Sequence, residues 1–317
     1  MSQVTADILL LLVTLVWGST FVLVKNAIET MGPLTFLAVR FFIAGTVLLV
    51  WHAVRNRTNS KPIDENREIV GDTKRHSPNN RFYVGGVLAG LALGFSYAMQ
   101  TLGLVTVPAG KAAFITGLYV VLVPIGAGLL LRTAPDLASV IGVSLATVGL
   151  ALLSLQFPLS IAPGDFLVLM CGVGFAAHIL LVGVYSNEGD PVLFTGIQLI
   201  VVALGTGLGA LIFERPLFVP SSAWGAIIFT ALAATSFAFL IQTAMQRYTS
   251  PTHTALIFSA EPVFGAVFAW LLTGETLKGR EILGAVCILI GMLVSELRSI
   301  QKPSPVPSTS EDRAVDA

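Results

Sequence analysis

Long apolar stretches, separated by short polar turns, follow one another along almost the whole chain. Ten of them approach the roughly 20 residues that a helix needs to cross the hydrocarbon core of a bilayer. Dipeptides such as Gly32-Pro33 and Asp190-Pro191 mark the turns between them. The pattern predicts an all-α polytopic membrane protein with ten transmembrane helices. We place them near residues 6–26, 34–54, 82–103, 106–131, 137–155, 164–186, 192–213, 223–245, 252–273 and 281–297.

Two polar segments interrupt this pattern. Residues 55–81 hold seven Lys or Arg and four Asp or Glu, and we interpret them as a cytoplasmic loop. Residues 298–317 are rich in Pro, Ser and charged residues, a composition that predicts a disordered cytoplasmic tail. The first apolar stretch lacks the basic start and the small-residue cleavage site of a signal peptide, so we expect it to be retained as a helix.

The composition indicates that lipid is the main solvent of the chain. Hydrophobic residues make up 55% of the sequence and charged residues only 11%, whereas a soluble domain carries roughly 25% charged residues. The formal net charge is zero, which gives no sign of a nucleic-acid partner. Cys171 and Cys287 lie in apolar stretches, where we expect small core residues rather than a disulfide or a metal site. We expect no cofactor and no metal.

Basic residues are distributed unevenly between the two sides of the membrane. With the N-terminus inside, the predicted cytoplasmic segments hold twelve Lys or Arg and the predicted outer loops hold three. Because such residues are retained on the cytoplasmic side, the bias places both termini in the cytoplasm. We therefore expect a multi-pass protein of the cytoplasmic (inner) membrane.

An internal repeat becomes visible when the chain is shifted against itself by 142 residues. Many identical residues then meet, with no gap between residues 89 and 149. Matches of Ala or Leu are common in an apolar chain, but matches of polar residues and of spaced glycines are not. The matches of this second kind are Gln100-Thr101 with Gln242-Thr243, and Gly142 and Gly149 with Gly284 and Gly291.

The first two apolar stretches repeat with a shift of 158 instead, which pairs Asp7 with Asp165 and Pro33 with Pro191. The difference of 16 residues between the two shifts corresponds to the long polar loop after the second stretch. Both shifts therefore describe one unit of five stretches, present twice.

Five is an odd number, so the second unit must enter the membrane upside down relative to the first. We place the first unit at residues 1–156 and the second at residues 157–297. Inverted repeats around a midplane site are typical of secondary transporters. The repeat thus predicts alternating-access transport of a small molecule, and two duplicated halves without a transport role are the alternative.

Three stretches of the chain resemble a known family. They are LVWGSTFVLVK in the first span, GLVTVPAGKAAFITGLYVVLVPI across the fourth and ALIFSAEPVFGAVFAWLLTGE across the ninth. Over roughly residues 6–297 the chain resembles the two EamA-type units of the drug/metabolite transporter superfamily. This resemblance implies a ten-helix bundle that moves small metabolites through a central cavity between the units. Members differ in cargo, so the resemblance does not name the substrate.

A single carboxylate lies inside the ninth stretch, where Glu261 is followed directly by Pro262. If the helix starts near Pro251, a rise of about 1.5 Å per residue puts Glu261 about 15 Å deep, near the midplane. An ionised carboxylate costs at least ~2.5 kcal/mol there, so it must face a wet cavity, find a partner or stay protonated. Two roles are open: a hydrogen bond that stabilises the bundle, or transport, with Glu261 as the candidate proton carrier.

Three cations, Lys25, Arg40 and Lys111, lie within apolar stretches on the predicted outer side. Each either reaches out to the interface or helps to attract a carboxylate or phosphate of the substrate. Arg40 fits the interface least, since it lies six residues into its stretch. Under the shift of 142 residues Lys111 aligns with His253, and residues aligned by either shift are called repeat mates below. We interpret His253 as a helix-end residue or a proton relay.

Polar-tipped side chains in the other stretches complete the candidate substrate cavity. Gln100 and Gln242 are repeat mates whose amides either suit an uncharged or zwitterionic substrate or bond neighbouring helices. Trp17 lies in mid-stretch, where it either contacts ligand or packs, and the small residues that follow it allow close helix approach. The full set of candidates is Trp17, Ser19, Arg40, Tyr97, Gln100, Lys111, Tyr119, His178, Gln242 and Glu261.

The leading prediction is a secondary transporter, expected to be an exporter, of amino acids or related amphipathic metabolites, with protons as the candidate coupling ion. An exporter of cationic drugs is the alternative, favoured by Glu261 and disfavoured by Arg40 and Lys111. An enzyme is expected least, because the sequence has no metalloprotease motif and no aspartate pair at a common depth. A channel is a third class of function, and it would require rings of like residues around an axis, which two unequal inverted halves do not supply. The oligomeric state is not defined by the sequence.

Overall fold

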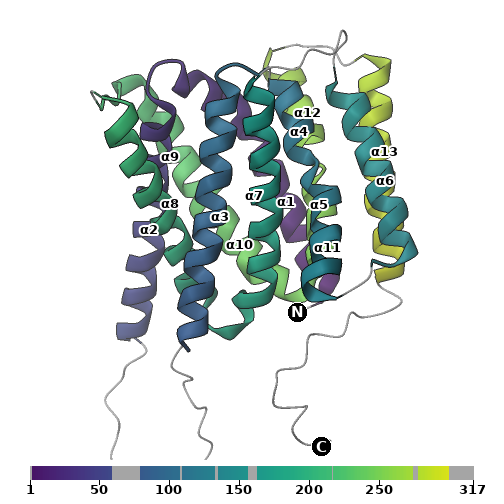
Figure 1. Cartoon of the computed structure of the whole chain (residues 1–317), viewed down its shortest axis with the longest axis horizontal. Coiled ribbons are helices and arrows are strands. Elements are labelled where there is room, and N and C mark those ends of the chain that lie inside the picture. Colours follow the sequence, from purple (N-terminus) through teal and green to yellow (C-terminus); the bar gives the residue numbers. More distant parts are fainter. Residues whose placement is uncertain are drawn as a thin grey trace, which may run out of the picture.

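Helices make up every regular element of the described chain, as the apolar stretches predict. They stand side by side and run across one slab, from one face to the other (Figure 1). The predicted all-α fold is therefore confirmed. The computed structural model describes residues 2–58, 79–107, 109–132, 135–155, 163–215, 217–273 and 278–299.

The first half of the chain makes five passes between the two faces. The face on which α1 begins, at the bottom of Figure 1, is called the N-terminal face below, and the opposite one is the far face. The elements of this half are α1 (Gln3–Ile28), α2 (Pro33–Thr58), α3 (Asn80–Leu104), the fourth pass with α4 (Ala109–Gly117), α5 (Tyr119–Gly126) and the π-helix η1 (Ala127–Leu131), and α6 (Leu137–Ser154).

The second half makes five more passes and starts at the far face, so it runs upside down relative to the first half, as predicted (Figure 1). Two of its passes are built from several helical pieces. Its elements are α7 (Pro163–Tyr185), η2 (Ser186–Glu188), α8 (Pro191–Phe213), the third pass with η3 (Ser221–Ala223), α9 (Trp224–Ala231), η4 (Leu232–Phe237), α10 (Ala238–Met245) and η5 (Gln246–Tyr248), the fourth pass with α11 (Pro251–Phe258) and α12 (Glu261–Thr273), and α13 (Gly279–Ser299).

The ten predicted stretches correspond to these passes to within a few residues at each end. By length and composition alone, eight helical stretches of the described chain can cross a membrane. The two other passes are the broken pair α11 and α12, and α13. The position of the boundary between the two units, near residue 156, stays a prediction.

The two polar segments begin later than predicted, because helices continue into them. α2 extends to Thr58, since Arg55 and Arg57 in its last turn suit the negative end of the helix dipole. α3 already begins at Asn80, and α13 extends to Ser299. The rest of the predicted loop and tail, residues 59–78 and 300–317, lies outside the described residues.

The fourth pass of each half is broken at an equivalent position. α4 gives way to α5 at Leu118, and α11 gives way to α12 at Ser259-Ala260. The amides of Leu118 and Ala260, which are repeat mates, bond carbonyls three residues back at 3.3 and 3.1 Å. In the second half Pro262 contributes to the break because it has no amide hydrogen. The break leaves Glu261 at the start of α12.

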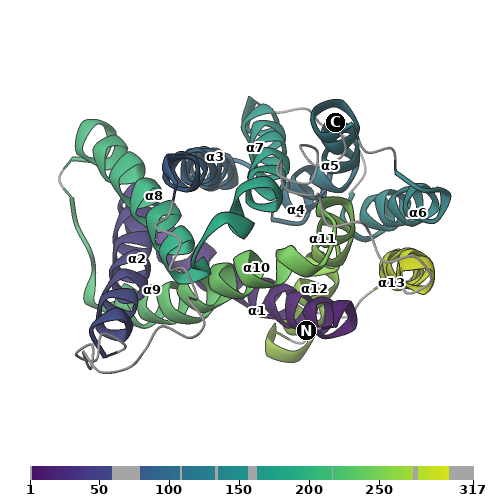
Figure 2. The same ribbon diagram turned by 90° about the horizontal axis from the view of Figure 1, so that it is seen from below.

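Contacts between helices follow a two-fold pattern that exchanges the two halves. The most extensive ones join α6 to α13 and α2 to α8, and each of these is a pair of repeat mates. The contact of α3 with α7 corresponds to that of α1 with α9 and α10, and the contact of α1 with α11 and α12 corresponds to that of α7 with α4 and α5. Figure 2 shows the two mate pairs at opposite ends of the molecule. The pseudo-two-fold axis therefore passes through them, in the plane of the slab.

Four glycines let α6 and α13 touch along their backbones. Gly142 faces Gly291, and Gly149 faces Gly284. A Cβ atom on any of the four would lie within 2.7 Å of the carbonyl oxygen of the facing glycine. The repeated glycine spacing in the sequence thus reflects one antiparallel contact that is the same from both sides, of the small-residue type common in membranes.

Acidic side chains fasten α2 to α8 at both ends. On the far face, the Glu214 carboxylate accepts hydrogen bonds from two amides in the first turn of α2, both at 2.8 Å. On the N-terminal face, Asp190 caps the start of α8 and pairs with Arg55 and, at 2.7 Å, with His52. Helices α2 and α8 are therefore held together at both ends as well as along their length.

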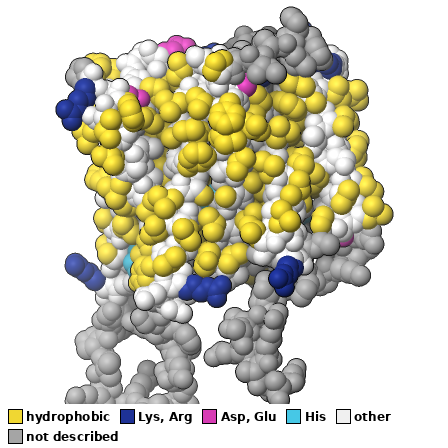
Figure 3. All heavy atoms as spheres, in the orientation of Figure 1, with side chains coloured by type: hydrophobic (Ala, Val, Ile, Leu, Met, Phe, Trp, Pro, Cys, Tyr) yellow, Lys and Arg dark blue, Asp and Glu magenta, His cyan; other side chains and the backbone are white. Residues whose placement is uncertain are grey.

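Hydrophobic side chains cover the middle of the face shown in Figure 3, while Lys and Arg lie near its upper and lower edges. Large apolar side chains are exposed on several helices, including Leu129, Leu130 and Phe213, each more than 70% accessible. Such a surface is unfavourable in water and matches the hydrocarbon layer of a bilayer. It supports a multi-pass membrane protein.

Candidate functional site

Two small hollows lie between the halves and share part of their wall. Each has a cavity volume of about 40 Å³, which is room for a few water molecules. Arg40 lines the first, called the Arg40 side below, and His178 lines the second, called the His178 side. Because both share several residues, they are parts of one contracted cavity that must widen to admit a metabolite. The shared residues are Trp17, Tyr97, Gln100 and Glu261.

Five passes contribute to this cavity with one local pattern, an aromatic residue followed three positions later by a polar one. Residues three apart lie on the same face of a helix, so each pass presents a ring and a polar group together. The pairs are Trp17/Thr20 on α1, Tyr97/Gln100 on α3, Phe175/His178 on α7, Phe239/Gln242 on α10 and Phe258/Glu261 at the junction of α11 and α12.

The rings of these residues form a connected aromatic wall. Trp17 lies 5.2 Å from Phe239 and 5.0 Å from Phe258 between ring centroids. Tyr97 lies 5.4 Å from Phe175 and 6.1 Å from Phe239. The rings are tilted or edge-on, the arrangement that aromatic pairs prefer. A wall of this kind suits the apolar or aromatic part of a ligand.

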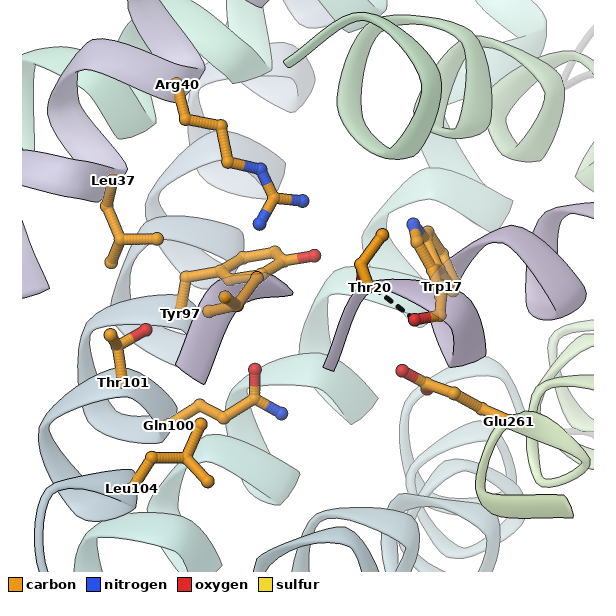
Figure 4. A pocket seen from close by; sticks show the side chains of 10 residues that line it. Trp17, Thr20, Leu37, Arg40, Tyr97, Gln100, Thr101, Leu104 and Glu261 are labelled. Atoms are coloured by element: carbon orange, nitrogen blue, oxygen red, sulfur yellow. Dashed lines mark hydrogen bonds between the residues drawn. The ribbon is translucent and has the colours of Figure 1, made fainter. Parts of the chain in front are cut away.

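Arg40 lies in the wall of the cavity and not at the membrane interface. It is only 3% exposed, and its Nε donates a hydrogen bond of 2.7 Å to Oγ1 of Thr235. Its guanidinium carbon lies 5.4 Å from the ring centroids of Phe41 and Tyr97, within cation–π distance. No Asp or Glu of the described residues forms an ion pair with it. The interface interpretation is wrong for Arg40, because its side chain points inward (Figure 4).

The π-helix η4 holds both Trp17 and Arg40 in place. Trp17 Nε1 donates to the carbonyl oxygen of Ala234 at 2.8 Å. The hydroxyl of Thr235, which accepts from Arg40, itself donates to the carbonyl oxygen of Thr230 at 2.8 Å. π-Helical turns are rare in proteins overall, and those that occur are often at functional sites. Here the widened turn of the second half positions two cavity residues of the first half.

Glu261 points into the cavity beside Trp17 and Thr20 (Figure 4). Gly18 permits this arrangement, because a Cβ atom at that position would lie 2.9 Å from the carbonyl oxygen of Glu261. Among the residues that the structure describes, the carboxylate has neither a hydrogen-bond partner nor an ion-pair partner. The interhelical hydrogen bond that a purely structural role requires is thus absent from this part of the chain.

Amide groups add further polar atoms to the wall. The Gln242 side-chain oxygen is buried and has no partner among the described residues. Gln100 makes only a long bond of 3.5 Å to a threonine hydroxyl. His178, in contrast, lies 2.8 Å from the side-chain oxygen of Gln198, the repeat mate of Arg40. Tyr119 is buried on the His178 side. The two glutamines therefore keep more capacity for a ligand than the histidine.

Two predicted site residues lie elsewhere. Ser19 lines neither side of the cavity, and its hydroxyl donates at 2.7 Å to a carbonyl of its own helix. Lys111 pairs with Asp165 of α7 at 2.5 Å. Lys25 is exposed near the far end of α1. The three predicted cations therefore do not converge on one ligand, and Arg40 is the one of them that lines the cavity.

Three phenylalanines of the wall, Phe175, Phe239 and Phe258, are not evident from polarity, since phenylalanine is common in membrane helices. The signal that identifies them is their spacing of three from a candidate polar residue, repeated on several passes. Thr235 gives no such signal, because its contact with Arg40 depends on how α2 meets η4.

The sequence pattern of the EamA-like transporter family matches the chain twice, over residues 4–155 and 162–297. The chain belongs to this family. An uncharacterized transporter of Archaeoglobus fulgidus is 32% identical over 293 residues, which are 92% of this chain and 86% of that protein. The uncharacterized transporter YyaM of Bacillus subtilis is 24% identical over 304 residues, with coverage of 93% and 94%.

One solved structure, described only as the crystal structure of a protein, shares the fold. Its TM-score is 0.74 at 17% sequence identity, and the match covers 95% of this chain and 100% of that one. Family membership makes the protein a membrane transporter, and the cavity between the two matched units becomes its candidate substrate site. Among the described residues, no three His, Cys, Asp or Glu side chains are grouped to hold a metal ion.

Proposed function

We propose that the protein exports small amphipathic zwitterions, such as amino acids, across the cytoplasmic membrane by alternating access. One observation carries the proposal. The buried cation Arg40 and the carboxylate Glu261, both without an ionic partner among the described residues, line one aromatic cavity. An amino acid supplies the matching carboxylate, ammonium and apolar group in a single molecule.

The charged ends of Arg40 and Glu261 approach the cavity from different walls (Figure 4). A guanidinium binds a carboxylate through charge-assisted hydrogen bonds, often two in parallel. The bond from Nε to Thr235 fixes its orientation in advance. Glu261 and the side-chain oxygen of Gln242 are acceptors that suit an ammonium group. Isolated buried charges are costly, so a zwitterion that neutralises both is favoured over a ligand that neutralises one.

Competition for Glu261 supports export. If its carboxylate binds either a proton or the ammonium of the substrate, the two exclude each other. A carrier that releases one and returns with the other exchanges them across the membrane. An inward proton gradient then drives the substrate outward. Protons are therefore the proposed coupling ion, with Glu261 as their carrier within the cavity.

Basic residues support the N-terminal face as the cytoplasmic one. The described residues on this side include Arg55, Arg57, Arg81, Arg132 and Arg247. Retention of such residues in the cytoplasm orients multi-pass proteins. Both termini and the loop after α2 would then be cytoplasmic.

Export of cationic drugs is the second candidate. The carboxylate of Glu261, the oxygen of Gln242 and the aromatic rings all suit an organic cation. Arg40 opposes this function, because the drug would share the cavity with a guanidinium that no carboxylate of the described residues neutralises.

Three compounds with one side chain separate the candidates. L-Phenylalanine is a zwitterion, phenethylamine is its cation without the carboxylate, and 3-phenylpropionate is its anion without the ammonium. We expect proteoliposomes to exchange the zwitterion in a saturable, pH-gradient-dependent way and to discriminate against both others. Faster movement of phenethylamine would establish the drug exporter instead, and no saturable movement of any zwitterion in a wider amino-acid panel would refute the proposal.

A further inference from the structure

Two ion pairs outside the cavity join the halves near opposite faces. On the N-terminal face, Oδ2 of Asp7 on α1 lies 3.5 Å from Nε2 of His253 on α11. On the far face, Oδ2 of Asp165 on α7 lies 2.5 Å from Nζ of Lys111 on α4. None of the four residues lines either side of the cavity. The pairs are therefore distinct from the candidate substrate site.

The two pairs are repeat mates of each other. Asp7 and Asp165 are related by the shift of 158, since 165 − 7 = 158, and Lys111 and His253 by the shift of 142, since 253 − 111 = 142. Each pair joins the first helix of one half to the fourth pass of the other half. The pseudo-two-fold pattern of helix contacts thus places one ion pair at each face.

Each pair lies just beyond the cavity along the helices that form its wall. His253 is five residues before the cavity residue Phe258, and Lys111 is five residues before the cavity residue Thr116. At about 1.5 Å per residue, each pair is roughly 7.5 Å from the wall, toward its own face. A cavity opens to one face when the halves part there. Parting the first helix from the fourth pass of the other half breaks the pair on that face.

The pairs differ in how they respond to protons. A lysine stays charged throughout the physiological range, whereas an imidazole changes charge between about pH 5 and pH 8. The pair of His253 attracts Asp7 when the imidazole is protonated and loses that attraction when the proton leaves.

Both residues of the Asp7–His253 pair are buried, so the carboxylate of Asp7 is little screened from this change of charge. Asp7 is 8% exposed and His253 is 5% exposed, and Nδ1 of His253 lies 3.2 Å from the Ser295 hydroxyl of α13. α6, which also packs against α11, carries no ionisable residue. The other helices packed against α11 are α1, α5, α7 and α13. Besides Asp7, and leaving aside α13 beyond Ser295, their ionisable residues are Lys25 on α1, Tyr119 on α5, Asp165, Cys171, His178 and Tyr185 on α7, and Arg280, Glu281 and Cys287 on α13.

We propose that Asp7–His253 and Asp165–Lys111 are the two latches of the transport cycle, and that the first is a proton-binding site. A proton on His253 holds the N-terminal face closed, and loss of that proton lets this face open. The inference rests on the proposed transport function, but it concerns which face opens rather than what is carried. With the N-terminal face in the cytoplasm, an acidic cytoplasm would hold the cavity shut to new substrate.

Accessibility of cavity cysteines tests the latches. Ile179 lines the His178 side, six residues before α7 ends at the N-terminal face, so Ile179→Cys in a chain with Cys171 and Cys287 replaced by serine reports on opening there. Val24 lines the Arg40 side near the far end of α1, so Val24→Cys in the same chain reports on opening to the far face. A membrane-impermeant maleimide is added from the N-terminal face in inside-out vesicles. Each rate is divided by that of the denatured protein at the same pH. Between about pH 8 and about pH 6 the rate should fall about fivefold, the change expected for one ion pair of modest strength.

Three variants separate a latch from a structural contact, with Ile179→Cys for labelling from the N-terminal face and Val24→Cys for labelling from the far face. His253→Lys makes the pair on the N-terminal face the same as the Asp165–Lys111 pair on the far face, so labelling from the N-terminal face should be slow at both pH values. Asp7→Asn removes the attraction, so labelling should be fast at both. Lys111→His gives the pair on the far face a titratable imidazole. Labelling from the far face, which should not depend on pH in the parent, should then become pH-dependent.

A rate from the N-terminal face that does not change with pH in the parent would overturn the proposal, as would an unchanged pH response in His253→Lys. If that variant does not elute as a folded protein, an unchanged pH response in Asp7→Asn decides against the latch. Protection of either cysteine by L-phenylalanine reports on the substrate proposal alone. Protection without a pH response refutes the latch only, and a pH response without protection by any amino acid refutes the zwitterion only.

Discussion

Replacement of Arg40 by glutamine should weaken binding of the substrate without destabilising the empty protein. Truncating one partner of a buried charge pair costs about 2–5 kcal/mol, and each 1.4 kcal/mol changes an affinity about tenfold. Arg40 is 3% exposed and is already oriented by Thr235. We therefore expect the affinity for a zwitterion to fall at least ~30-fold.

The empty protein should respond in the opposite direction, because its guanidinium is buried without a carboxylate among the described residues. A buried charge without a counter-charge is costly, because it has lost its hydration and gained no ionic partner, and glutamine removes that cost. The melting temperature without ligand should hold or rise. Binding of phenethylamine should hold or improve, since a repulsive cation is gone.

Equilibrium binding of L-phenylalanine and phenethylamine in nanodiscs, together with thermal unfolding of the empty protein, measures both effects. Arg40→Lys is the matched control, since it keeps the charge and loses the planar fork, and should lie between the two. An unchanged ratio of the two affinities would refute the role of Arg40 in carboxylate binding. A variant that loses stability and binds both compounds equally poorly would show that Arg40 only packs.

Three further outcomes follow from the geometry. Glu261→Gln should bind substrate weakly and exchange it without response to an imposed pH gradient, and a full response in the flux assay would exclude Glu261 as the proton carrier. Gly149→Leu should part α6 from α13 and lower the yield of folded protein on size-exclusion chromatography, whereas Gly205→Leu, where an added Cβ meets no atom of the described residues within 4 Å, should elute like the parent. Trp17→Phe keeps a ring but loses the bond to Ala234, so affinity should fall about fivefold, from about 1 kcal/mol; an unchanged affinity would show that this bond does not orient the ring.

The passes of this protein are predictable from sequence because each depends on a local quantity, the length of an apolar run. The inverted arrangement follows from the odd number of passes in a repeat. Arg40 and Glu261 are predictable for a related reason, since a charge inside an apolar helix must face something other than lipid. These features require no knowledge of how one helix meets another.

The features that are not predictable depend on such meetings. Lys111 resembles Arg40 in sequence, but Asp165, 54 residues away, takes it out of the cavity. The hydroxyl of Ser19 turns back to its own helix, whereas Gly18 beside it makes the contact with α12. The π-helical turn at Thr235 contains neither Gly nor Pro, and the hydroxyls of Thr235 and Ser236, which bond carbonyls five residues back in it, are equally common in ordinary helices. Direction around a helix axis is set by packing, and spacing alone does not determine it.

The mate pairs have a consequence for the order in which the chain is assembled. The partner of α2 does not begin until Pro191, and the partner of α6 is α13, the last described helix to leave the ribosome. Until then the side of α6 that carries Gly142 and Gly149 has no helix packed on it and faces lipid. A product that stops before Gly279 should therefore be degraded by membrane quality control, and two separately translated halves should survive only when both are made in one cell.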